Sequence, residues 1–183
     1  GHENAALCIP SVNAFVPGSG AGMSVTVEDT DACPRYSGVS LSGITVGESP
    51  KWLRERLKAV GIKPINNVVD VTNYVMMETG QPRHAFDAAA IAGRKVIVRK
   101  LKQGTRFRTL DGTERELSAD DLMICNETEG MCIAGVFGGM GSGITEKTRE
   151  VFLESAYFSP AGIRRTSARH GLKTDASFRY ERG

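Results

Sequence analysis

Cysteine is scarce in this chain and lacks the spacing that metal sites need. The 183 residues contain four cysteines, Cys8, Cys33, Cys125 and Cys132, with no CxxC pair and no histidine cluster beside them. A zinc site is therefore not expected, and no metal is assigned. A chain of this length folds without disulfides, so we interpret the cysteines as small buried residues of a reduced, cytoplasmic protein.

Long apolar runs are also missing. No stretch approaches the roughly 18 consecutive apolar residues of a membrane span, and no signal-peptide pattern is present. The composition is 40% hydrophobic and 24% charged, which is typical of a chain that buries a real core. We therefore expect a globular domain with no membrane partner.

Acidic residues are absent from residues 88–110, although basic residues are frequent there. That first basic run contains Arg94, Lys95, Arg99, Lys100, Lys102, Arg106 and Arg108. A second basic run near the C-terminus contains Arg164, Arg165, Arg169, His170 and Lys173. Such runs either follow an RNA phosphate backbone or form an ordinary solvated surface, and the net charge of +2 does not decide between them.

The pattern of the chain predicts an α+β fold. We interpret residues 1–22 as a tag remnant and a flexible leading segment, and residues 23–183 as a single domain. Within it we expect a helical first half (45–91), mainly strands (92–158), and a C-terminal helix and loop (159–183). The helices should pack against an antiparallel, sandwich-like set of strands.

Local signals place several elements. Ser49 and Pro50 should cap and open a first helix, and a second should run from about residue 65 to 79 and end at Gly80. Asp111-Gly112 predicts a β-hairpin. The helix 65–79 is followed by a polar turn containing His84, one of only three histidines.

Five motifs occur in a fixed order: INNVVDVTNYVMMETGQPRHAFD, TLDG, AGVFGG, LESAYFSP and GLKTDASFRYERG. Together they resemble the beta chain of bacterial phenylalanyl-tRNA synthetase, in its central editing region, the third and fourth modules. The resemblance implies an excised editing domain of phenylalanine-tRNA ligase, which hydrolyses tyrosine misattached to phenylalanine tRNA. It also implies an alpha chain partner in an alpha2-beta2 enzyme, whose aminoacylation site would use ATP and magnesium elsewhere, leaving no cofactor here.

The resemblance implies that Glu154 holds the tyrosine hydroxyl. A pocket that hydrogen-bonds a substrate hydroxyl rejects the analogue that lacks it by about 10⁴–10⁵. Glu154 lies in the apolar stretch VFLESAYF, where a carboxylate without a partner is costly. The alternative interpretation is a glutamate on the solvent face of an edge strand.

Three residues are implied as catalytic by the same resemblance: His84, Asn73 and Thr174. His84 would hold a water or the adenosine end of the ester, and Asn73 would donate to the carbonyl region. The ordinary alternatives are a capping or core histidine, a helix-surface amide and a loop-capping threonine. With no Ser-His-Asp or Cys-His arrangement in these motifs, attack by a positioned water is expected.

Gly138, Gly139 and Ala176 complete the predicted site as substrate-binding residues. Glycine lets a backbone approach a ligand closely, and amides freed there would bind an oxyanion, although an ordinary turn also uses two glycines. Ala176 would be a small wall that leaves room for a ring. Two other functions stay open: a non-catalytic RNA-docking or structural module, and a free-standing relative acting on another aminoacyl ligand.

Overall fold

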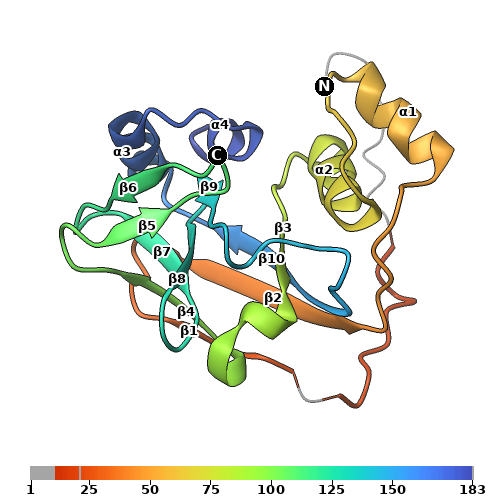
Figure 1. The fold of residues 1–183 in the computed structure, drawn as a ribbon, viewed down its shortest axis with the longest axis horizontal. Coiled ribbons are helices and arrows are strands. Elements are labelled where there is room, and N and C mark those ends of the chain that lie inside the picture. The colour runs from red at the N-terminus through yellow and green to blue at the C-terminus, as the bar shows by residue number, and fades with distance from the viewer. Residues whose placement is uncertain (1–10, 21, 183) are drawn as a thin grey trace.

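The computed structural model describes residues 11–20 and 22–182. The predicted tag remnant lies outside the described residues, and residues 11–20 contain neither helix nor strand. In the described part of the chain, four α-helices accompany three β-sheets, which confirms the predicted α+β class (Figure 1).

A three-stranded antiparallel sheet forms the centre of the fold, in the order β2-β10-β3. Its strands are β2 (Arg35–Ser42), β10 (Glu150–Tyr157) and β3 (His84–Asp87). His84 pairs directly with Glu154 of β10. The predicted turn at His84 is therefore wrong, because pairing with a strand distant in sequence extends the backbone there.

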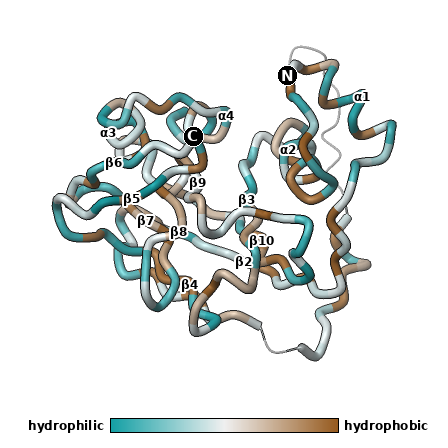
Figure 2. Tube along the Cα trace, in the orientation of Figure 1, coloured by the Kyte–Doolittle hydropathy of each residue, from teal (hydrophilic) through white to brown (hydrophobic). Residues whose placement is uncertain are grey.

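A five-stranded sheet lies beside it, in the order β1-β4-β7-β8-β9. Its strands are β1 (Ser24–Val27), β4 (Lys95–Lys100), β7 (Leu122–Cys125), β8 (Gly130–Ile133) and β9 (Phe137–Gly138). The β1–β4 pair is parallel, which departs from the antiparallel prediction, whereas the other pairs are antiparallel. All four residues of β7 are buried, and hydrophobic colours follow the central strands in Figure 2.

The predicted hairpin is confirmed by β5 (Arg106–Arg108) and β6 (Glu114–Glu116), which pair antiparallel. Gly112 in its turn has a φ of 79°, a left-handed conformation that glycine adopts without strain. Three of the cysteines, Cys33, Cys125 and Cys132, are free and buried, as predicted.

Two helices at one end of the molecule, α1 (Lys51–Ala59) and α2 (Asn67–Thr79), pack on each other (Figure 1). The predicted serine cap of α1 is wrong, since the Ser49 hydroxyl instead donates to the buried carboxylate of Asp70. Asn66 caps α2 by accepting from two backbone amides, and Gly80 ends it with a φ of 76°. No helix in the described ranges is both long and apolar enough to cross a membrane.

The C-terminal segment forms two helices, α3 (Pro160–His170) and α4 (Asp175–Tyr180), where one helix and a loop were predicted. Two short 3₁₀ turns, Ala88–Ala90 and Ala92–Arg94, link β3 to β4.

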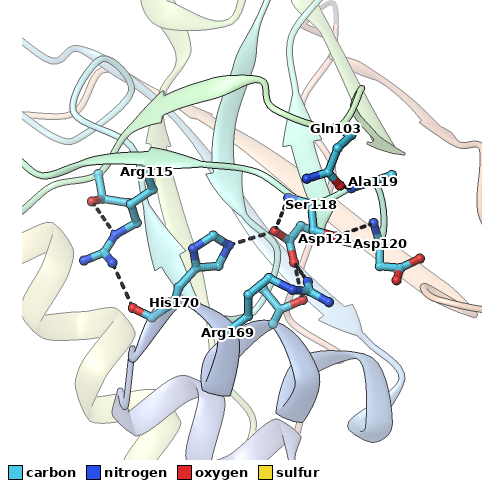
Figure 3. A network of polar contacts seen from close by, with 10 residues as sticks. Gln103, Arg115, Ser118, Ala119, Asp120, Asp121, Arg169 and His170 are labelled. Carbon is cyan, nitrogen blue, oxygen red and sulfur yellow. Dashed lines mark hydrogen bonds and ion pairs between the residues drawn. The ribbon is translucent and has the colours of Figure 1, made fainter.

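A buried carboxylate, Asp121, fixes α3 against the strands (Figure 3). It accepts hydrogen bonds from the Ser118 amide at 2.8 Å and the Thr166 hydroxyl at 2.9 Å, and it contacts His170 Nε2 at 2.7 Å and the Arg169 guanidinium. Burial alone would raise the pKa of this carboxyl, but the hydrogen bonds outweigh burial and lower its pKa. Because a buried charge needs such partners, the cluster ties α3 to the segment that leads into β7.

Candidate functional site

The carboxylate of Glu154 is buried in the centre of β10, with 3% of the residue exposed. Its direct neighbours across the sheet are Gly38 on β2 and His84 on β3. Directly opposed residues of an antiparallel pair point to the same face, so Glu154 and His84 lie side by side. The alternative of a solvent-facing glutamate on an edge strand is wrong, because Glu154 is buried and β10 is the middle strand of its sheet.

Tyr36 is the hydrogen-bond partner of this carboxylate. Its hydroxyl donates to Glu154 Oε2 over 2.7 Å, although the two residues are 118 positions apart in sequence. Tyr36 lies two residues from Gly38 on β2, which places its ring diagonally across the sheet from Glu154, within the reach of an aromatic side chain. The phenol group of Tyr36 therefore already occupies one oxygen of the Glu154 carboxylate.

The protonation of Glu154 is set by its surroundings. Burial raises the pKa of this carboxyl to about 7, even though the Tyr36 hydrogen bond lowers it. The pKa of Tyr36 is raised well above its usual value by burial and by the Glu154 charge. Tyr36 consequently remains a donor at neutral pH, while Glu154 exchanges a proton in the physiological range.

His84 is neutral in this environment. Its ring lies against Phe86 at a centroid separation of 4.4 Å, and burial lowers its pKa to about 4. A neutral imidazole has one N–H donor and one nitrogen acceptor, so it can orient a water or a carbonyl without adding charge.

A cavity of about 70 Å³ opens beside these two side chains. We call it the Glu154 cavity; it is lined by Pro82, Arg83, His84, Cys132, Gly135, Val136, Phe137, Gly138, Glu154, Ala176 and Tyr180. Of the predicted site residues, His84, Glu154, Gly138 and Ala176 are thus brought together. Since a water takes about 30 Å³ of liquid, the space holds about two waters, and a larger guest requires the walls to move.

The two predicted glycines face different surroundings. A Cβ on Gly138 would lie 3.3 Å from His84 Cε1 and 2.8 Å from Leu110 Cδ1, so the glycine keeps the wall beside the imidazole open. The Gly139 amide instead donates to the Met131 carbonyl over 2.8 Å. The expected free amide at Gly139 is therefore wrong, because the backbone ladder uses it.

Asn73 and Thr174 do not line the Glu154 cavity. Asn73 is half-buried on α2. The Thr174 hydroxyl caps α4 by accepting from the Ser177 amide, and it donates to the carbonyl of Val136, a cavity residue, over 3.0 Å. The contacts of Thr174 in this structure are thus those of the capping alternative. Contact of Asn73 or Thr174 with a substrate stays a prediction.

Sequence reasoning missed several residues of this site. Neither Tyr36 nor Arg83 was among the predicted site residues. Arg83 lines the cavity and its guanidinium donates to the Ser155 hydroxyl. Gln81 donates to the Ala156 carbonyl at 2.9 Å and lies 3.4 Å from the Tyr180 hydroxyl, which ties the segment before β3 to β10 and α4. The polar run that follows α2 was the sequence signal that could have identified Gln81 and Arg83.

No group of three or more metal-ligating side chains is found within residues 11–20 and 22–182. The site geometry is that of a small, mostly apolar cavity with one titratable carboxyl, one neutral imidazole and one guanidinium in its walls.

Sequence comparison places the chain among known proteins. A family model described as the B3/4 domain matches residues 32–183. The phenylalanine–tRNA ligase beta subunit of Bacteroides fragilis is 58% identical over 182 residues, covering 99% of this chain and 22% of that protein. The corresponding subunit of Geobacter metallireducens is 52% identical over 174 residues, covering 95% of this chain and again 22% of that protein. The chain thus spans about a fifth of the length of these curated relatives.

Structural comparison gives the same fold. An N-terminal fragment of the phenylalanyl-tRNA synthetase beta-subunit from Pyrococcus horikoshii superposes with a TM-score of 0.54 at 12% identity, covering 86% of this chain and 52% of that chain.

Proposed function

The chain belongs to the B3/4 domain family, and on that basis we propose that it is the editing region of a phenylalanine–tRNA ligase beta subunit. In this proposal it hydrolyses tyrosine wrongly attached to phenylalanine tRNA. The observation that carries the proposal is the buried Glu154 carboxyl in the wall of a cavity that it shares with His84.

Glu154 supplies the chemistry that separates tyrosine from phenylalanine. Tyr36 occupies Oε2, so the other oxygen is the one offered to a substrate hydroxyl. A hydrogen bond to a charged group contributes about 1.5–3 kcal/mol, and a phenylalanine ring would leave that acceptor unpaired in a buried site. Tyrosine is therefore the ligand that satisfies the carboxylate.

Entry of the tyrosine ring requires the cavity to widen. Ala176 and Gly138 keep two walls thin, whereas Arg83 and Phe137 are only half-buried. In this proposal these two side chains move outward to admit the ring. The ring would lie between Ala176 and Gly138, with its hydroxyl at Glu154.

His84 positions a water at the ester. The water oxygen bonds to the ester carbonyl carbon, the bond from that carbon to the ribose oxygen breaks, and the proton ends on the ribose oxygen, releasing tyrosine. Because the pKa of His84 is about 4, the imidazole is a weak base at neutral pH, and its role is to orient the water. Asn73 and Thr174 remain predicted contributors that would have to reach the bound ester.

The remaining features of the proposal concern the whole enzyme. The complete beta chain would assemble with an alpha chain in a cytoplasmic alpha2-beta2 ligase that binds phenylalanine tRNA. Aminoacylation, with its ATP and magnesium, would take place outside this domain.

A second candidate function is a non-catalytic RNA-docking module of the same fold. Two of the three predicted catalytic residues, Asn73 and Thr174, lie outside the cavity wall, which favours this alternative.

Deacylation of aminoacylated phenylalanine tRNA tests the proposal. The protein, in excess, is mixed with tyrosyl-tRNA and with phenylalanyl-tRNA, and the loss of ester is followed in single-turnover time courses. We expect faster loss of the tyrosyl ester, and a slower rate with His84→Ala. Equal rates on both esters, or no rate above that of buffer, would favour the non-catalytic module.

A further inference from the structure

A basic groove of about 490 Å³ lies between α3 and α4. We call it the α3–α4 groove. Its charged and aromatic walls come from Arg164 on α3, Lys173 in the connection, and Phe178 and Arg182 at the end of the chain. It therefore contains part of the second basic run of the sequence, which the Glu154 cavity does not use.

Four of the seven cations of the first basic run form ion pairs with acids. Its ion pairs are Arg94–Glu150 at 2.7 Å, Lys95–Glu127 at 2.6 Å, Lys100–Asp29 at 2.9 Å and Arg106–Glu114 at 2.7 Å. Of the groove cations, Arg164 donates to the Glu181 carbonyl, and Lys173 has no ion pair or hydrogen bond among the described residues. Within the described residues, none of the three groove cations, Arg164, Lys173 and Arg182, forms an ion pair with an acid.

Phe178 gives the groove an exposed aromatic surface. The residue is 55% exposed, and the Arg182 guanidinium carbon lies 3.5 Å from its ring centroid. A cation held on a ring in this way keeps both the ring and the charge in a fixed place. Aromatic rings flanked by basic side chains are the arrangement that binds single-stranded nucleic acid, since bases stack on the ring and phosphates contact the cations.

The one acid in the groove is already engaged. Glu181 Oε1 accepts a hydrogen bond from the Ser167 hydroxyl over 3.1 Å. It therefore opposes a phosphate less than a free carboxylate would, and the three cations outnumber it.

The groove adjoins the Glu154 cavity through α4. Ala176 and Tyr180 line the cavity, whereas Phe178 and Glu181 of the same segment line the groove. Thr174 lines the groove, and its hydroxyl bonds to the carbonyl of a cavity residue. The groove thus lies on the other side of α4 from the cavity, and the two come closest in sequence and contact at Thr174.

We propose that the α3–α4 groove binds single-stranded RNA, with a base stacked on Phe178 and phosphates at Arg164, Lys173 and Arg182. The identity of the strand rests on the proposed function, in which it is the 3′ end of the tRNA that carries the ester. Binding of RNA by the groove does not itself require hydrolysis.

Fluorescence anisotropy with a labelled 12-nucleotide single-stranded RNA, carrying no amino acid, tests the proposal at low and moderate salt. We expect Phe178→Ala and Lys173→Glu each to weaken binding about 10-fold, in line with typical stacking and phosphate contacts. Lys58→Glu on α1, a charge reversal at another exposed lysine, is the control and should change binding less than twofold, because salt screens charges at that distance. Melting curves confirm that the three variants fold.

The proposal would be overturned if the wild type did not bind the RNA, or if Lys58→Glu weakened binding as much as the groove variants. It would also be overturned if polyglutamate, or a double-stranded form of the same RNA, bound with the same affinity as the single strand. Loss of RNA binding in the groove variants, together with absent ester hydrolysis in the wild type, would support the groove and reject the editing proposal. Ester hydrolysis by the wild type, with RNA binding unchanged in the groove variants, would support the editing proposal and reject the groove.

Discussion

The hydrogen bond between Tyr36 and Glu154 provides a sharp test of how the buried carboxyl is held. Tyr36→Phe removes only the hydroxyl that donates to Glu154 Oε2 over 2.7 Å. An unsatisfied buried acceptor costs about 1–3 kcal/mol, and at pH 8, above the pKa of about 7, the carboxyl is mostly ionised. For a chain of this size that cost lowers the melting temperature by about 2–12 °C.

The size of this loss should depend on pH, and the sign follows from the pKa. Below pH 6 Glu154 is protonated and needs the donor less, so the loss of stability should be smaller at pH 5 than at pH 8. Thermal melting followed by circular dichroism measures both values. Tyr157→Phe, at a 48% exposed position of β10, the strand that carries Glu154, is the control. The reasoning is refuted if Tyr36→Phe costs no more than Tyr157→Phe, or costs the same at both pH values.

Three further outcomes are expected. Ala176→Trp should abolish tyrosine binding while lowering stability by no more than the 1–3 kcal/mol typical of overpacking, and unchanged binding would place the pocket elsewhere. Gly139→Ala should lower the melting temperature more than Gly141→Ala, because its Cβ would lie 2.6 Å from the Met131 carbonyl oxygen whereas Gly141 has open space; equal melting temperatures would contradict this. The pKa of His84 in the folded state, about 4, lies below the unfolded value of about 6.5, so its contribution to stability is lost as pH falls from 6.5 through 4. His84→Asn should flatten that part of the melting-temperature profile, and an unaltered profile would show that the ring is hydrated.

Features set by local sequence were predicted well. Gly80 ends a helix with a positive φ, and Asp111-Gly112 turns a hairpin, because such signals act over a few residues. Glu154 was placed correctly in a strand of apolar residues, and it is buried because it shares a face of β10 with the buried Phe152 and Ala156.

The features that were missed depend on contacts between distant segments. The Tyr36–Glu154 bond joins positions 118 residues apart and follows from the register of β2 on β10, which no local pattern specifies. Pairing of β3 with β10 likewise turned His84 from a loop residue into a strand residue. His170 was counted with a surface run, yet its side chain is only 6% exposed because Asp121 binds it. Tertiary structure overrides local preference at each of these positions.

The central claim is that Glu154 recognises the hydroxyl of tyrosine. Isothermal titration calorimetry at pH 8, with free tyrosine and free phenylalanine, measures this without tRNA or hydrolysis. Tyrosine should bind the wild type more tightly by about 1.5–3 kcal/mol, and Glu154→Gln should reduce the difference to the 0.5–1.5 kcal/mol of a neutral hydrogen bond. Equal affinity of the wild type for the two amino acids, or an unchanged preference in Glu154→Gln, would contradict the claim.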